Sequence, residues 1–283
     1  MEPSAGGTTA FALPRGTCDA HCHVFGPADR FPYSPKRKYE PADSPKEALA
    51  ALHRRLGIDR AVIVQASAHG TDNRAMLDAL QSRPHSYRGV AIIDTATSDS
   101  DLQQMHALGV RGIRFNFVRS LGGYPDPYEF RRAIERVRPL GWHAVLHMKG
   151  DDLLNLKDEI ARLPLPFVID HMGRVDVGLG IGQPAFATLL QLVRKDTAWV
   201  KLSGAERMAP RSYGEAVPFA RALLTAAPDR VLWGTDFPHP NLAEDVSEEE
   251  LVQLIPRFAP SCDEQQRLLV RNPAALYEFP ASE

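Results

Sequence analysis

Short apolar runs rich in β-branched residues recur along this chain and alternate with amphipathic segments. Eight such runs are present: CDAHCHV (18–24), RAVIVQAS (60–67), YRGVAIID (87–94), VRGIRFNF (110–117), WHAVLHM (142–148), PFVIDHM (166–172), AWVKLS (198–203) and RVLWGTD (230–236). Nearly continuous apolar strands are typical of parallel sheets covered on both faces. The alternation predicts an α/β protein, and eight strands, each followed by a loop and usually a helix, predict a (β/α)8 TIM barrel.

Helix start and stop signals separate these runs. Residues 44–57 begin with Ser44 and a proline, carry a glutamate three residues after the serine and end at Gly57, which predicts a helix with a capping box. Four further segments follow a similar pattern: 71–84, 98–109, 126–141 and 183–196. The alternative fold is an open doubly wound sheet, but no strand end carries the G-x-G-x-x-G phosphate signature of that fold.

One barrel accounts for the length of 283 residues, because such domains commonly run to about 250 residues. We expect residues 1–16 to form a flexible N-terminal segment and residues 17–283 to form a single barrel domain. A hydrophobic fraction of 44% suits a soluble protein with a sizeable core. A net charge of −2 gives no electrostatic footprint for nucleic acid or an anionic membrane.

The cysteines and the N-terminus predict a cytoplasmic protein with reduced thiols. Cys18, Cys22 and Cys262 form no disulfide framework, and the first two lie too far apart in an extended strand to bridge. No apolar run approaches the roughly 20 residues of a membrane span. The first residues also lack the basic and apolar regions of a secretion signal. A homo-oligomer stays open at this stage.

The first run places chemical side chains at alternate positions. In an extended strand, Asp19, His21 and His23 would share one face. The small side chains between them, Cys18, Ala20 and Cys22, would share the other face. The pattern predicts one chemical face and one packed face.

Polar side chains collect at the C-terminal ends of the predicted strands, where a (β/α)8 barrel carries its chemistry. The set comprises His21, His23, Gln65, Ser67, His69, Asn73, Arg114, Asn116, Arg119, His147, Lys149, Asp170, His171, Arg174, Lys201, Ser203, Glu206, Arg207, Thr235, Asp236, His239 and Asn241. The long charged, proline-rich segment 26–45 follows the first strand. We expect it at the same rim, because loops of this length in compact domains are usually functional.

Each of these residues also has a structural explanation. Asp236 could cap the following turn, and Arg114 could pair with a core carboxylate. Lys201 could pack its stem on apolar neighbours and keep its head in solvent. His53 is expected on a solvated helix face. Three other histidines are expected away from the rim: His85, His106 and His143. A functional site is favoured because polar residues follow successive strands.

These motifs resemble those of the amidohydrolase superfamily, specifically its branch of small lactonases. DAHCHVFG at the first strand, DHMG at the sixth and GTDFPHP at the eighth carry the resemblance. Further stretches match in order: CHVFGPADRFPYSPKRKYEPADSPKEAL, VIVQASAHGTDNRAMLDAL, GVRGIRFNFV, GWHAVL, VIDHMGRVDV, VLWGTDFPHPN and the ending NPAALYEF. An H-x-H pair alone is weak evidence, but the ordered set over most of the chain is strong evidence.

The resemblance implies an amidohydrolase-like barrel that hydrolyses a small carboxylated lactone, such as 2-pyrone-4,6-dicarboxylate, in the catabolism of aromatic compounds. It implies that Asp236 activates water, with three histidines around the reacting carbonyl: His21, His23 and His171. It further implies that five residues hold the carboxylates and ring of the substrate: Tyr39, Ser67, His69, Arg114 and Arg207. Arginine forks suit this task because they bind carboxylates bidentately.

Two positions depart from the family pattern, and both touch the predicted substrate pocket. Two basic residues are expected after RFNFV, where this chain has Arg119 followed by Ser120. A tyrosine is expected near the end of the fifth strand, where this chain has His147. We include Arg119 and His147 among the predicted substrate-binding residues, and the identity of the lactone stays open.

The same residues raise the question of a metal. A mixed nitrogen and oxygen set could hold zinc with one open position: His21, His23, His171 and Asp236. The resemblance implies that many superfamily members bind metal with this set, whereas the pyrone hydrolases do not require one. We expect that no cofactor is required, because arginines already supply positive charge. A divalent metal such as zinc is the alternative, with His147 as a further candidate ligand.

Two other functions remain as alternatives. One is a zinc-dependent decarboxylase or C–C hydrolase of the same superfamily. The other is a non-enzymatic small-acid binding protein, because a barrel does not by itself imply catalysis. The favoured partner is a small anionic lactone, and neither nucleic acid nor a membrane is expected.

Overall fold

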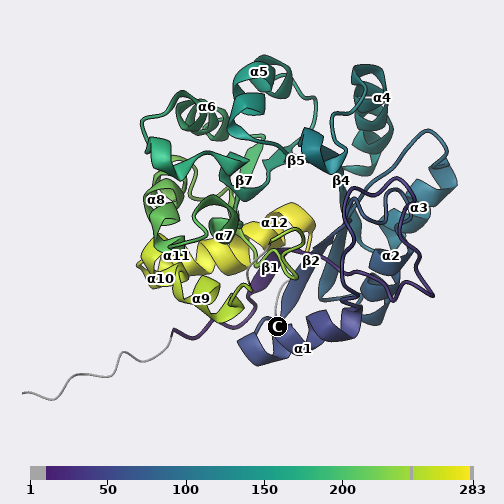
Figure 1. Cartoon of the computed structure of the whole chain (residues 1–283), viewed down its shortest axis with the longest axis horizontal. Helices are drawn as coiled ribbons and strands as arrows, with labels where there is room; N and C mark the ends of the chain where they lie inside the picture. Colours follow the sequence, from purple (N-terminus) through teal and green to yellow (C-terminus); the bar gives the residue numbers. More distant parts are fainter. Residues whose placement is uncertain (1–10, 243–244, 281–283) are drawn as a thin grey trace, which may run out of the picture.

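The computed structural model describes residues 11–242 and 245–280, and its strands form one eight-stranded parallel sheet in the order β1 to β8 (Figure 1). The strands are β1 (Cys18–Cys22), β2 (Arg60–Val64), β3 (Tyr87–Ala91), β4 (Val110–Asn116), β5 (His143–His147), β6 (Phe167–Ile169), β7 (Ala198–Leu202) and β8 (Val231–Trp233). Each lies inside a predicted run. Parallel pairing of each strand with the next one in the chain confirms the (β/α)8 barrel.

Helices surround the sheet (Figure 1). They are α1 (Lys46–Leu56), α2 (Arg74–Ser82), α3 (Asp99–Ala107), α4 (Pro127–Val137), α5 (Gly150–Ile160), α6 (Pro184–Val193), α7 (Ala205–Met208), α8 (Val217–Ala226), α9 (Glu248–Gln253), α10 (Ile255–Phe258), α11 (Cys262–Gln266) and α12 (Asn272–Tyr277). Shorter turns are η1 (Arg119–Leu121), η2 (Arg138–Leu140), η3 (His171–Arg174), η4 (Val177–Leu179), η5 (Tyr213–Ala216) and η6 (Arg267–Arg271). The five predicted helical segments are confirmed as α1, α2, α3, α4 with η2, and α6.

The apolar core has two parts because side chains alternate along each strand. Ile63 of β2 belongs to the larger cluster, which also contains residues of the surrounding helices such as Met76 of α2. Val62 and Val64 belong to a smaller cluster inside the barrel. This smaller cluster includes Tyr277 from the C-terminal end of the chain.

The C-terminal segment closes the barrel at the start of the strands. Arg60, the first residue of β2, donates to the carbonyl oxygen of Val270 at 3.0 Å. Arg88 of β3 donates to the carbonyl oxygens of Tyr277 and Glu278 at 3.2 and 3.0 Å. The opposite end of the barrel, where the strands finish, is therefore the end left for chemistry.

The predicted single chemical face of β1 is wrong for Asp19. The pairing of β1 with β2 shifts in register between Asp19 and Cys22. A bulge of this kind adds one residue and reverses the alternation of side chains. Asp19 therefore contacts His53 of the surrounding helix α1, and Cys22 joins the outer cluster instead of the inner one that holds Cys18. His53 is buried, so its predicted solvated position is also wrong.

The predicted capping box at Ser44 is wrong, although α1 ends at Gly57 as predicted, in a left-handed conformation with φ of 76°. Ser44 instead forms an antiparallel bridge with Phe25, with N···O distances of 2.9 and 2.8 Å in the two directions. The bridge ties together the two ends of the charged segment 26–45.

The predictions for the N-terminus and the thiols have different outcomes. Residues 1–10 of the expected flexible segment lie outside the described residues, whereas the backbone N–H of Phe11 donates to Gln253 of α9 at 3.0 Å. The single-domain boundary at residue 17 stays a prediction. All three cysteines are free, as predicted. Within residues 11–242 and 245–280, none of the helices has the length and apolar character needed to cross a membrane.

Candidate active site

Three imidazoles converge on one oxygen of Asp236 at the C-terminal end of the barrel. Their Nε2 atoms lie 3.5, 3.4 and 3.9 Å from Oδ1 of Asp236, in the order His21, His23 and His171. All four side chains are buried. The four predicted catalytic residues, far apart in the sequence, therefore lie together in space.

Backbone hydrogen bonds fix Asp236 against the first strand. Its N–H donates to the carbonyl oxygen of His21 at 2.8 Å, and the N–H of His23 donates to the carbonyl oxygen of Phe237 at 2.8 Å. Asp236 has a φ of 66° and His171 a φ of 54°, which non-glycine residues adopt at a cost of roughly 1 to 2 kcal/mol. The surrounding bonds must hold this strained backbone in place.

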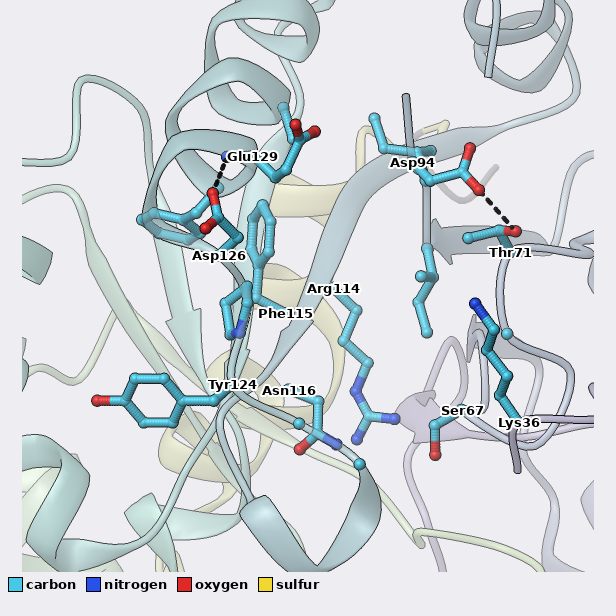
Figure 2. Close-up of a pocket in the computed structure, with 18 of the residues that line it drawn as sticks. Lys36, Ser67, Thr71, Asp94, Arg114, Phe115, Asn116, Tyr124, Asp126 and Glu129 are labelled. Atoms are coloured by element: carbon cyan, nitrogen blue, oxygen red, sulfur yellow. Dashed lines mark hydrogen bonds between the residues drawn. The ribbon is translucent and has the colours of Figure 1, made fainter. Parts of the chain in front are cut away.

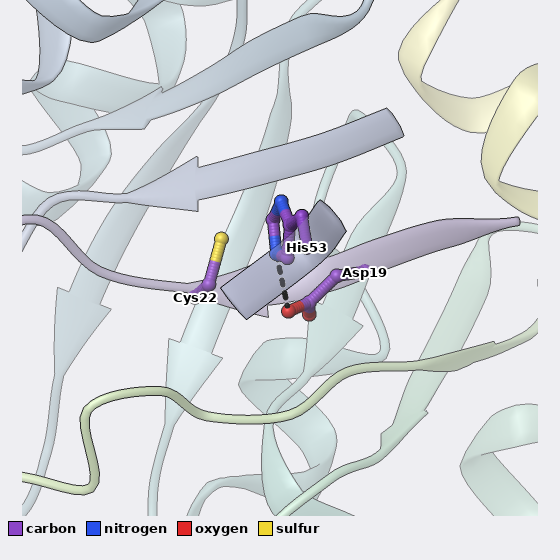
Figure 3. A group of neighbouring side chains, drawn as sticks. All are labelled: Asp19, Cys22 and His53. Carbon is purple, nitrogen blue, oxygen red and sulfur yellow. Dashed lines mark hydrogen bonds and ion pairs between the residues drawn. The ribbon is translucent and has the colours of Figure 1, made fainter. Parts of the chain in front are cut away.

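Asp19 contributes to this support from the outer side of the strand. Its Oδ1 accepts hydrogen bonds from the backbone N–H groups of His21 and Thr235 at 3.1 and 3.0 Å. Its Oδ2 accepts from the hydroxyl of Thr235 at 2.6 Å. The same oxygen lies 3.2 Å from Nε2 of His53 (Figure 3). Asp19, Cys22 and His53 lie close enough together to hold a metal ion. However, both carboxylate oxygens of Asp19 already accept hydrogen bonds, and burial raises the pKa of the Cys22 thiol well above its usual range. This group is structural.

A buried ion-pair network lies behind His21. Nζ of Lys201 lies 3.3 Å from Oδ1 of Asp170 and 3.1 Å from Nδ1 of His21. Nη2 of Arg114 lies 3.4 Å from Oδ2 of Asp170. Lys201 is fully buried, so the predicted solvent-exposed head group is wrong, because the ammonium has a carboxylate partner inside the barrel. The structural alternative for Arg114, a core carboxylate partner, is present as well.

These contacts set the charges at neutral pH. Burial alone would raise the pKa of Asp236, but the Arg207 guanidinium and the neighbouring imidazoles hold it well below its usual range. Burial lowers the pKa of His21 to about 4, because the nearby Asp170 offsets this effect only in part. Burial also lowers the pKa of His171 well below its usual value. An ionised carboxylate therefore faces the neutral imidazoles of His21 and His171.

Arg207 and His147 complete the inner part of the site. Nε of Arg207 donates to Oδ2 of Asp236, and its Nη1 donates to the carbonyl oxygen of Pro240 at 3.1 Å. His147, at the end of β5, has Nε2 at 3.3 Å from Nη1 of Arg174. Arg174 was not among the predicted substrate-binding residues, although its position after the sixth strand marked it as a rim residue.

The other predicted binding residues lie in different surroundings. Tyr39 forms a hydrogen bond with Ser67 and lies near Arg114, and burial raises the pKa of its phenol. His69 has both ring nitrogens engaged by backbone: Nε2 accepts from Gly26 N–H at 3.2 Å, and Nδ1 lies 3.3 Å from a carbonyl oxygen of segment 26–45. This ring therefore holds that segment.

Arg119 lies apart from the reacting centre. Its side chain is exposed, and its guanidinium stacks 4.3 Å above the ring of Tyr124. The structure does not bring Arg119 together with Asp236 and the three imidazoles.

Some site residues were predicted at the rim of the barrel but were given no catalytic or binding role. Lys201 and Asp170 are two of them, although a signal was present: Lys201 is a charged residue inside an apolar strand, which requires a buried partner. His239 contacts Glu206 at 3.3 Å and Glu248 at 3.6 Å. Burial opposes protonation of His239, but the two carboxylates outweigh it and raise its pKa to about 9.

The donor atoms around Asp236 fit a divalent metal ion. Nδ1 of His23 lies 2.7 Å from the carbonyl oxygen of Val64, which can only accept, so Nδ1 donates there and Nε2 is the ring nitrogen that faces Asp236. Nε2 of His21 is buried and has no hydrogen-bond partner among the residues that the structure describes. Outer partners such as the Val64 carbonyl and the Asp170 carboxylate are typical of metal-bound histidines.

A cavity of about 820 Å³ opens beside this centre (Figure 2). It reaches the predicted binding residues at Ser67 and Arg114 and is bordered by segment 26–45 and α4. Asp236 and the three imidazoles do not line it. Segment 26–45 thus lies at the rim where it was expected.

The chain is a (β/α)8 barrel with a buried aspartate and three imidazoles at the C-terminal ends of its strands. This arrangement is typical of barrel enzymes whose active sites are built from histidine and aspartate. The family model described as Amidohydrolase matches residues 18–279, and the chain belongs to this family.

Known proteins of similar sequence act on lactones. The chain is 46% identical to a 2-pyrone-4,6-dicarboxylate hydrolase of Comamonas testosteroni, with 94% of this chain and 92% of that protein covered. It is 40% identical to a 4-sulfomuconolactone hydrolase of Rhizobium radiobacter, with 95% of this chain and 92% of that protein covered. A solved structure from Agrobacterium tumefaciens superimposes with a TM-score of 0.86 at 29% identity, covering 96% and 98% of the two chains.

Proposed function

We propose that this chain is a lactone hydrolase that opens a small carboxylated lactone, 2-pyrone-4,6-dicarboxylate or a close analogue, with a water molecule activated by Asp236. The lactone hydrolase class is supported by the relatives named above. The observation that carries the proposed mechanism is the convergence of three imidazole Nε2 atoms on Oδ1 of Asp236.

Asp236 acts as the base. Its carboxylate is ionised at neutral pH, so it can accept a proton from a water molecule that attacks the ring carbonyl carbon. The ring C–O bond then breaks, and the proton passes from Asp236 to the departing ring oxygen. The buried imidazoles around Oδ1 exclude bulk water and orient the attacking one.

Arg207 links substrate binding to the strength of the base. In the free protein its guanidinium pairs with Asp236, which weakens that carboxylate as a base. A substrate carboxylate competes for the same guanidinium, because arginine binds carboxylates through charge-assisted bonds. Binding therefore loosens the pair and raises the pKa of Asp236 when the water must be deprotonated.

Three cations stabilise the negative charge of the substrate and of the transition state. Arg207 pairs with Asp236, and Arg114 pairs with Asp170 behind His21. Arg174 lies near Asp236, and its burial together with the neighbouring arginines lowers its pKa. Preorganised positive charge in a water-poor site is an effective source of transition-state stabilisation.

We propose that turnover needs no metal, because these cations already supply the charge that polarises the carbonyl. Where a divalent ion such as zinc is bound, its ligands would be the four convergent residues: His21, His23, His171 and Asp236. The ion would supply a Lewis acid that lowers the pKa of bound water. The roles given above to the side chains do not depend on it.

An ultraviolet assay tests the proposal. Purified protein, before and after removal of metal with a chelator, is mixed with 2-pyrone-4,6-dicarboxylate and with muconolactones, and loss of ring absorbance or release of acid is followed. Opening of at least one lactone supports the function. Failure to open any of them, with a decarboxylation or C–C cleavage that requires zinc, would replace it with the alternative enzyme class.

Binding of the acids without turnover would favour the small-acid binding protein. The cytoplasmic location and any homo-oligomer stay predictions.

A further inference from the structure

The cavity beside the reacting centre is larger and more positively charged than a compact ring with carboxylates requires. Its volume of about 820 Å³ lies towards the upper end of the range for ligand sites. Six cationic side chains line it, against three acidic ones. Three of the six already have carboxylate partners: Arg37 with Glu40, Arg114 with Asp170 and Arg136 with Asp99. Arg114 connects it to the centre, because Arg114 lines the cavity and also contacts Asp170 behind His21.

Most acidic groups in the cavity wall are already engaged. Asp94 accepts hydrogen bonds from Thr71 and from backbone N–H groups of its own turn. Asp126 caps α4 by accepting from the backbone N–H groups of residues 128 and 129 (Figure 2). Both carboxylates keep their negative charge, but among the described residues neither forms an ion pair with a cation of the cavity.

Three cationic side chains of the cavity wall still offer donors. Nε of Arg114 is buried and lacks a hydrogen-bond partner among the described residues. Nothing in residues 11–242 and 245–280 forms an ion pair with Lys36 or Lys38, which lie on segment 26–45 and line the same cavity. Figure 2 shows the guanidinium of Arg114 pointing towards Ser67, with Lys36 on the adjoining wall.

We propose that this cavity is a subsite for an acidic group carried on an arm outside the lactone ring, held by Lys36 and Lys38 beyond Arg114. This inference rests on the proposed function and names a substrate class: lactones with a carboxylate or sulfonate on a flexible substituent. The ring would lie against Asp236 while the arm passes Arg114, since this residue borders both spaces. Unpaired donors and free volume both favour such a ligand.

The test compares two substrates in the full-length protein. One is 2-pyrone-4,6-dicarboxylate, whose acids are on the ring, and the other is a muconolactone, whose carboxylate is on a methylene arm. For the double variant Lys36→Gln with Lys38→Gln, kcat/KM for the muconolactone should fall about tenfold, the value of roughly one charge-assisted hydrogen bond, while that for the pyrone stays within about twofold. Lys157→Gln, at an exposed position of α5, is the matched control.

Each outcome separates the two proposals. If the parent protein opens neither lactone, the proposed function fails. If it opens either one and the double variant loses activity on both equally, or on neither, the arm subsite is overturned while the proposed function stands.

A second inference comes from Asp19. We infer that Asp19 is a positioning residue that acts on the proposed base through Thr235. Its carboxylate binds the backbone of His21 and both the N–H and the hydroxyl of Thr235, the residue before Asp236. The Thr235 hydroxyl oxygen in turn accepts from the N–H of Phe237 at 3.1 Å, so bonds anchored on Asp19 flank the strained backbone of Asp236 on both sides.

Substitutions at Thr235 test this inference without removing a buried charge. Thr235→Val removes the hydroxyl at constant shape and should lower kcat about 10- to 100-fold with KM within about threefold, because small misplacement of a reacting group has effects of this size. Thr235→Ser restores the hydroxyl and should return kcat to within about threefold of the parent value. If folded Thr235→Val keeps the parent kcat, or if Thr235→Ser fails to restore it, the inference is overturned.

Discussion

Substitution of Lys201 by methionine tests the buried network behind His21. Methionine keeps the apolar stem and removes the ammonium that lies 3.3 Å from Asp170. Removing one partner of a buried pair typically costs about 3 to 5 kcal/mol. Arg114 remains 3.4 Å from Asp170, so this carboxylate is not left without a cation. We therefore expect a loss at the lower end, about 3 kcal/mol of the free energy of unfolding.

Urea unfolding measures this loss. Trp142 and Trp233 are buried, so their fluorescence reports the transition. The midpoint should move to lower urea with an unchanged m-value. Lys157→Met provides the control, since a change at an exposed helix position is expected to stay within about 0.5 kcal/mol.

The double variant Lys201→Met with Asp170→Asn completes the test. Because each side chain stabilises the other, the double variant should be more stable than the sum of the two single losses predicts, by about 1 kcal/mol or more. Equal midpoints for Lys201→Met and Lys157→Met, or strict additivity in the double variant, would refute the view that Lys201 balances a buried carboxylate.

Three further predictions follow from the site. Asp236→Asn should lower kcat by a factor of roughly 10² to 10⁴, the usual contribution of a positioned base, in steady-state assays. The pKa of His239 is raised to about 9 in the folded protein, so its contribution to stability is present below pH 6.5 and is lost as the pH rises through 9. Unfolding free energy measured over this range should fall by up to about 3 kcal/mol, and His239→Gln should flatten the profile. Chelation should leave most lactonase activity, whereas loss that zinc restores would contradict the metal-free mechanism.

Much of the fold was predictable from the sequence because it depends on local pattern. The apolar runs and the helix signals between them are periodic features, and each strand lies inside its predicted run. The face assignment in β1 failed because a bulge near Asp19 depends on pairing with a neighbouring strand. The start of α1 failed for a related reason, since Ser44 pairs with Phe25 instead of capping the helix.

The candidate site also has a part that could be predicted from the sequence and a part that could not. Residues at strand ends, such as His21, His171 and Asp236, could be placed together because the barrel brings all strand ends to one rim. The buried residues that contact these side chains could not be predicted in this way. Burial of Lys201 with Asp170 requires adjoining strands to point two charged side chains at the same interior point, and no short stretch of sequence encodes that.

The Phe25–Ser44 bridge has an evolutionary consequence. It holds the two ends of segment 26–45 together through backbone hydrogen bonds, whatever side chains lie between them. Lengthening a flexible loop is inexpensive, with each doubling adding only about 0.6 kcal/mol of closure entropy. The residues of this segment could therefore change during evolution while the residues around Asp236 stay the same. Related barrels could in this way come to bind substrates with different acidic groups.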